Sequence, residues 1–136
     1  MKIKINKIKL IDSINILDEL PLKGLKSIHR SRLREKLTSE LERVIKEEKQ
    51  LKKDYSNVDE KGEPIINDGY YDIRDMDNFQ KVLSEFYQET IIIDDNNDEV
   101  YLESVKGALE DADVQWSGKK AIDYAYLYDA FQTNKG

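Results

Sequence analysis

The chain has 136 residues, the length of one domain, and it contains no cysteine and a single histidine, His29. The lack of cysteine excludes a disulfide framework, thiolate zinc sites, iron–sulfur clusters and a cysteine nucleophile. Charged residues make up 37% of the chain, and its net charge is −6. No apolar run approaches the roughly 18 residues that span a membrane, and no signal peptide is visible. We therefore expect a soluble, intracellular protein with one domain over residues 1–136.

The net charge conceals two halves of opposite sign. Residues 1–53 carry 15 Lys or Arg and 8 Asp or Glu, whereas residues 54–136 carry 7 and 20, so the halves have net charges of +7 and −13. Either the halves pack together and neutralise each other, or one of them faces a charged partner. The basic half has no aromatic residue before Tyr55 and no nucleic-acid-binding motif, so direct nucleic-acid binding is not expected.

The first segment of the chain changes its apolar spacing. Ile3 and Ile5 alternate with lysines, which predicts a short half-buried strand. The apolar residues then shift to helical spacing, with Asp12 or Ser13 as the N-cap of a short helix that Pro21 ends.

The clearest element covers residues 24–55. Its apolar residues recur mostly at three- and four-residue steps, and no Gly or Pro interrupts them after Gly24. This pattern predicts an amphipathic helix of about eight turns, some 45 Å long. Such a helix exceeds the expected width of the domain, so we expect part of it to project and to pair with a partner or a second copy.

The rest of the chain alternates turn signals with short apolar segments. Asn67-Asp68-Gly69 predicts a β-hairpin, and residues 90–93 are expected to form a second hairpin with Val100 and Leu102. Shorter helices are predicted after an N-cap at Asp75 or Asp77, over residues 104–111, and from Ser117 or Gly118 onward. The predicted fold is α+β: a long N-terminal amphipathic helix packed with small antiparallel β-hairpins and two or three shorter helices.

The last predicted helix has two apolar faces. One comprises Ile122, Ala125, Tyr126 and Ala130, and the other Tyr124, Leu127, Tyr128 and Phe131. The sequence leaves open which face is buried.

The acidic run Asp94–Asp98 invites comparison with a calcium loop. It supplies oxygen ligands at the first, third and fifth positions, but Glu99 stands where that loop needs glycine and Val105 where it needs glutamate. We therefore expect a polar turn and no metal.

No other group predicts catalysis. His29 has no carboxylate and nucleophile at helical spacing, so it is expected to lie at the surface or boundary. Glu85 and Glu89 are placed on one helix face, but accidental pairs are expected among 28 acidic residues. We expect no enzymatic activity and no cofactor.

Aromatic and charged side chains supply the candidate partner-binding residues. Tyr and Trp anchor protein interfaces, although here they could instead complete a thin core. A pair of arginines on one helix face suits a carboxylate or phosphate, or an internal ion pair. The candidates are Trp116, Tyr124, Tyr128, Asp94, Asp95, Asp98, Arg30 and Arg34.

Several segments carry a family resemblance: Arg32–Leu37, Glu47–Leu51, Lys53–Tyr55, Asp59–Pro64, Phe79–Phe86 and Tyr128–Phe131. Together they resemble small phage and prophage proteins of unknown function from low-GC Gram-positive bacteria (domain of unknown function 1617 type). The resemblance implies a phage origin and action in the cytoplasm of the bacterial host, and it supplies no catalytic residues.

These observations predict a non-catalytic phage-type protein that binds a host or phage protein. In one version its acidic half inhibits a host defence protein by competing with nucleic acid for a basic groove. The alternatives are an accessory role in virion or tail assembly, a small ligand-binding protein or enzyme, and a homo-oligomer formed through the long helix.

Overall fold

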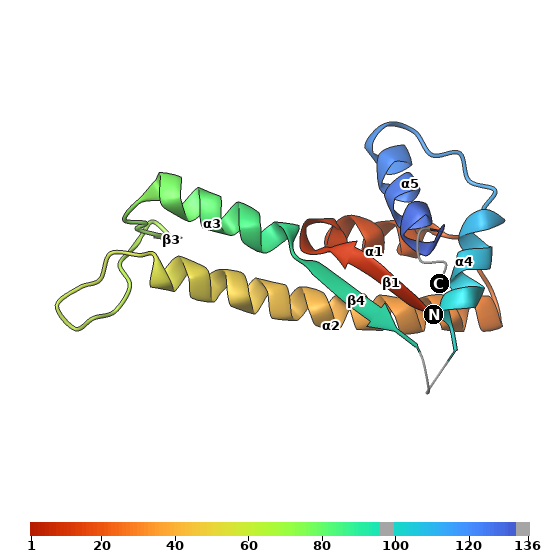
Figure 1. The fold of residues 1–136 in the computed structure, drawn as a ribbon, viewed down its shortest axis with the longest axis horizontal. Helices are drawn as coiled ribbons and strands as arrows, with labels where there is room; N and C mark the ends of the chain where they lie inside the picture. The colour runs from red at the N-terminus through yellow and green to blue at the C-terminus, as the bar shows by residue number, and fades with distance from the viewer. Residues whose placement is uncertain (96–99, 133–136) are drawn as a thin grey trace.

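A computed structural model describes residues 1–95 and 100–132, and it confirms the predicted α+β fold. In chain order its elements are β1 (Lys2–Asn6), a 3-10 turn η1 (Lys7–Lys9), α1 (Leu10–Glu19), α2 (Leu25–Asp54), β2 (Ile66–Asn67), β3 (Tyr70–Tyr71), α3 (Met76–Gln88), β4 (Thr90–Asp94), α4 (Leu102–Glu110) and α5 (Gly118–Gln132) (Figure 1). None of the helices in the described ranges is long and apolar enough to cross a lipid bilayer.

Helix α2 confirms the predicted long helix, with 30 residues from Leu25 to Asp54. We call residues 1–44, 89–95 and 100–132 the body of the molecule. The first half of α2 packs there, and its Leu33 and Leu37 are fully buried. Its second half projects from the body with α3 alongside (Figure 1). We call residues 45–88 the arm, because they form this projection.

The sheet of the body joins strands from distant parts of the chain. Strand β1 pairs with β4 in antiparallel register, with Ile3 opposite Ile93 and Ile5 opposite Ile91. All four isoleucines are buried, which is the half-buried alternation predicted for the first segment.

The second predicted hairpin is wrong, because β4 pairs with β1 and Leu102 begins α4. The side chain of Asp95 accepts hydrogen bonds from the N–H groups of Tyr101 and Leu102, at 3.0 and 2.8 Å. These bonds satisfy two of the open donors at the start of α4, which favours a helix here.

The first predicted hairpin is confirmed, with Ile66 opposite Tyr71 and Asn67 opposite Tyr70. Asp68 and Gly69 form its turn with φ values of 52° and 82°. Two positive φ angles are required by a type I′ turn, the tight turn whose twist matches the flanking strands.

The remaining helices differ in how well their ends and faces were predicted. Helix α3 begins after Asp75, one of its two predicted N-caps, which accepts a hydrogen bond from the N–H of Asn78 at 3.1 Å. Helix α1 begins at Leu10, ahead of the two predicted caps, because it continues directly from η1. Helix α5 buries the face of Leu127 and Phe131.

Candidate functional site

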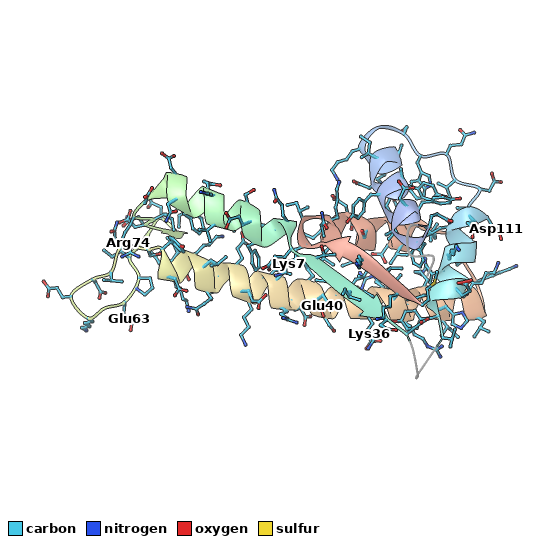
Figure 2. All side chains as sticks on the ribbon, viewed as in Figure 1. Lys7, Lys36, Glu40, Glu63, Arg74 and Asp111 are labelled. Carbon is cyan, nitrogen blue, oxygen red and sulfur yellow. The ribbon has the colours of Figure 1, made fainter. Side chains whose placement is uncertain are left out.

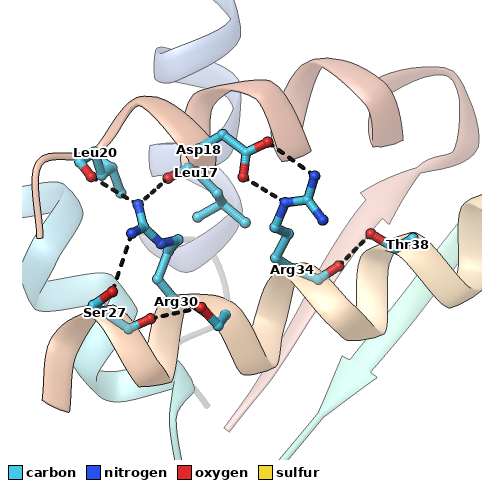
Figure 3. Close-up of polar contacts among 8 residues, drawn as sticks. Leu17, Asp18, Leu20, Ser27, Arg30, Arg34 and Thr38 are labelled. Atoms are coloured by element: carbon cyan, nitrogen blue, oxygen red, sulfur yellow. Dashed lines mark hydrogen bonds and ion pairs between the residues drawn. The ribbon is translucent and has the colours of Figure 1, made fainter. Parts of the chain in front are cut away.

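Arg30 and Arg34 lie on the face of α2 that meets α1 (Figure 3). Arg30 donates from Nη1 to the carbonyl oxygens of Leu17 and Leu20, both at 2.8 Å, and so caps the end of α1. Arg34 donates from Nε and Nη2 to both carboxylate oxygens of Asp18, at 2.5 and 3.2 Å. Both guanidinium groups therefore join two helices, in agreement with the internal alternative for this pair.

The three aromatic candidates lie in contact with one another. Trp116 stacks on Tyr124 at 5.5 Å between ring centroids, and Tyr124 contacts Tyr128 at 6.0 Å. The Tyr124 hydroxyl donates to the carbonyl oxygen of Leu109 in α4. All three aromatic residues are half-buried and pack against the core, which favours the core-completing alternative.

The acidic candidates have internal partners as well. Asp95 is buried, and its carboxylate lies 3.3 Å from the amino group of Met1 in addition to capping α4. Asp94 lies 3.9 Å from Lys2 across the sheet. Asp98 lies outside the described residues.

The groups considered for catalysis lie apart. His29 is half-buried at the boundary of the body. Glu89 follows α3 with extended backbone and pairs with Lys7 at 2.5 Å, so it does not share a helix face with Glu85. Within residues 1–95 and 100–132, no three His, Cys, Asp or Glu side chains gather as metal ligands would.

The two charged halves of the chain contact each other in the body. Lysines of the basic half pair with carboxylates of the acidic half: Lys2 with Asp94, Lys7 with Glu89, and Lys9 with Asp123. Lys119 also bridges Asp12 and Asp123, at 2.8 Å from each, and joins α5 to α1. Internal neutralisation therefore accounts for part of the charge division.

The end of the arm is different. We call residues 54–77 the tip. Three backbone hydrogen bonds close a ring within it: Asn57 N–H to Asp72 O, Asp72 N–H to Ile65 O, and Ile65 N–H to Asn57 O, at 2.7, 2.9 and 2.9 Å. Tyr55, two residues before Asn57, packs on Phe79 of α3 with ring centroids 5.8 Å apart. Each of the three extended segments is thus hydrogen-bonded to the other two, which fixes the backbone conformation of the tip.

The surface of the tip is both acidic and apolar. Residues 54–77 carry 8 Asp or Glu against Lys61 and Arg74, a net of −6. The described residues show no ion pair that involves a side chain of the tip. Val58 and Ile66 are each 55% exposed and Tyr70 is 78% exposed. Figure 2 shows Glu63 and Arg74 at this end of the molecule, far from the body.

The sequence does not single out the tip as a candidate surface. Its charge is visible in the sequence, because most of the acidic excess of residues 54–77 falls on turns. The exposure of Ile66 and Tyr70 is not visible there, since both residues occur in a β pattern that usually has one buried face.

The chain matches no family model, no curated protein and no solved structure. The functional assignment therefore rests on the site itself.

Proposed function

We propose that this chain is a non-catalytic, phage-type protein that binds another protein through the tip of its arm. The observation that carries this proposal is that the tip combines exposed apolar side chains, those of Val58, Ile66 and Tyr70, with a net charge of −6. Protein interfaces have apolar centres enriched in Tyr, and complementary charge around them sets association rate and specificity. The fitting partner presents an apolar pocket surrounded by Lys and Arg.

The phage origin rests on the resemblance carried by segments such as Arg32–Leu37 and Phe79–Phe86, and it implies action in the cytoplasm of a bacterial host. A nucleic-acid-binding groove has the charge that the tip complements. A protein that occupies such a groove with the tip would block a host defence nuclease.

An accessory role in virion or tail assembly is the second candidate. It is favoured by the shape of the arm, because a projecting pair of helices reaches a neighbouring subunit without contact between the bodies (Figure 1). Both candidates use the same surface and differ in the partner.

Affinity capture from bacterial lysate, before and after phage infection and with nuclease present, tests the proposal. The wild-type chain is compared with the double variant Ile66→Ser/Tyr70→Ser and with Ile122→Ser. Ile122 is a matched control, because it is 64% exposed and lies on α5, away from the arm.

We expect one stoichiometric partner that binds the wild type and Ile122→Ser, and that is lost from the tip variant and at about 0.5 M salt. A host protein would support inhibition, and a phage structural protein would support assembly. The proposal is wrong if the tip variant captures the same proteins as the wild type, or if the wild type captures none.

A further inference from the structure

Strand β4 has an outer edge that no strand of the described chain covers. Hydrogen bonds at both ends of the β1–β4 ladder fix its alternation. Lys7 N–H donates to Glu89 O at 2.9 Å, and Asp95 N–H donates to Met1 O at 3.4 Å. In an antiparallel ladder every second residue pair exchanges hydrogen bonds, so the bonded pairs continue inward from these two.

The alternation directs the main chain of Ile92 outward. Its neighbours Ile91 and Ile93 bond to β1, whereas the N–H and C=O of Ile92 point away from β1. Across residues 1–95 and 100–132, no hydrogen bond reaches these two groups. Natural edge strands are usually protected by charge, proline or a bulge. Ile92 has none of these, and its side chain is 57% exposed.

A groove of 540 Å³ runs along this edge. Residues 90–92 form its strand side, and α2 forms its other side with Glu40, Arg43, Val44 and Glu47. Lys7 and Glu89 close one end (Figure 2 labels Lys7 and Glu40). The volume lies in the range of natural ligand sites, and one long wall is an unsatisfied strand edge.

We propose that this groove binds an extended segment of a partner protein as a third strand beside β4. Strand addition supplies main-chain hydrogen bonds to an open edge, and alternate side chains enter the adjoining pockets. Residues of the added strand that face the core side would meet Val44 and Ile91, which are buried and apolar. The apolar positions of the segment should therefore alternate.

The charges of the rim select the other positions. Three carboxylates line the groove, from Glu40, Glu47 and Glu89, and each is ion-paired with Lys7 or Arg43, so the rim keeps a net charge of −1. A segment that alternates apolar with basic residues therefore matches both the floor and the rim. The chain itself uses this alternation at residues 2–6, which pair with the opposite edge of β4.

The groove favours a lone segment over a second copy of this chain. In a second copy the same edge of β4 has its own α2 beside it. If two such edges paired, the α2 helices of both copies would have to lie beside the same pair of β4 strands. A segment without a flanking helix meets no such obstacle.

Selection from a displayed library of random peptides tests this inference, with the wild-type chain as the target. Ile92→Pro removes the outward N–H while the ladder to β1 remains, because a proline is tolerated where an edge N–H faces solvent. Ile92→Ser is the control, because it keeps the N–H. Hydrogen exchange of the free and peptide-bound wild type gives a second readout that needs no variant.

We expect enriched peptides that alternate apolar and basic residues, bind the wild type and Ile92→Ser, and bind Ile92→Pro about tenfold more weakly. The Ile92 amide should exchange quickly in the free protein and slowly in the complex. The inference is overturned if no peptide is enriched, if the Ile92 amide stays unprotected in the complex, or if the edge instead mediates dimerisation in sedimentation experiments.

This inference concerns a different surface from the tip. Ile66→Ser/Tyr70→Ser should leave peptide binding unchanged, and Ile92→Pro should leave capture through the tip unchanged. Failure of either proposal can therefore be recognised separately.

Discussion

The indole ring of Trp116 stacks on the phenol ring of Tyr124, with centroids 5.5 Å apart and planes inclined by 20°. This contact fastens the loop before α5 to that helix, and the Tyr124 hydroxyl continues the connection to Leu109 in α4. Trp116 is the single tryptophan of the chain, so its fluorescence reports directly on how α5 docks.

Tyr124→Leu should lower the free energy of unfolding by about 1–3 kcal/mol, because the stacking contact and one hydrogen bond are lost. Denaturant unfolding measures this change, and Trp116 emission should move to longer wavelength in the folded variant. Ile122→Ser, on the exposed face of the same helix, should stay within about 0.5 kcal/mol of the wild type. Equal destabilisation by both variants would contradict the docking described for α5.

Arg30→Ala should lower the free energy of unfolding by about 1.5–3 kcal/mol, because hydrogen bonds from a charged group are lost. The carbonyl oxygens of Leu17 and Leu20 at the end of α1 lose this donor, which lies 2.8 Å from each. The control is Lys26→Ala, an exposed position on α2 that should change stability by less than about 0.5 kcal/mol. Similar unfolding curves for the two variants would show that Arg30 does not hold α1.

Asp95 makes the body sensitive to acid. Burial raises the pKa of Asp95, but hydrogen bonds from the N–H groups of Leu102 and Tyr101 and the amino group of Met1 outweigh it and leave the pKa lowered. A lowered carboxyl pKa contributes stability above the unfolded value of about 4, which is lost as the pH falls through the folded value.

Asp95→Asn should therefore cost about 1 kcal/mol at neutral pH through its weaker cap. It should also reduce the slope of stability against pH below about pH 4. Denaturant unfolding from neutral pH into the acid range measures both effects. An unchanged acid slope would mean that another carboxyl group controls acid unfolding.

Tyr87 connects the two helices of the arm. Burial, followed by its hydrogen bond to Glu48, raises the pKa of Tyr87 to about 12. A raised pKa contributes stability below the unfolded value of about 10, which is lost as the pH rises through the folded value. The contact between α3 and α2 should therefore weaken between about pH 10 and pH 12.

Near-ultraviolet titration of the tyrosines measures this ionisation. A component that titrates near pH 12 should be present in the wild type and weaker in Tyr87→Phe, where Tyr124, whose pKa burial also raises, still titrates late. Tyr70→Phe is a suitable control, because that ring is 78% exposed. If Tyr87→Phe retains the whole late component, the arm does not bury this hydroxyl.

Elements with local signals could be predicted from the sequence. Helix α2 follows from uninterrupted helical spacing after Gly24, α3 from its Asp75 cap, and the β2–β3 hairpin from Asp68-Gly69. The pairing of β4 with β1 could not be predicted, because Ile93 and Ile3 are far apart in sequence and local alternation does not identify a strand's partner.

The candidate residues illustrate the same limit. The sequence places Arg34 with Arg30 on one helix face. It does not identify Asp18 as the partner of Arg34, because that contact depends on how α1 packs along α2. The sequence places Trp116 and Tyr124 among the candidate partner-binding residues, whereas their stacking and the bond from Tyr124 to Leu109 depend on how α4 and α5 pack. The sequence does not reveal that Ile66 in the tip is exposed, because its exposure depends on how the other elements of the fold pack.

Contact between the tip and a partner protein can be tested by site-specific photo-crosslinking in infected cells. A photoreactive amino acid replaces Ile66 in one version of the chain and Ile122 in another. Binding through the tip predicts one crosslinked protein from position 66 and none from position 122. No crosslink from position 66, or the same crosslinked proteins from both positions, would contradict it.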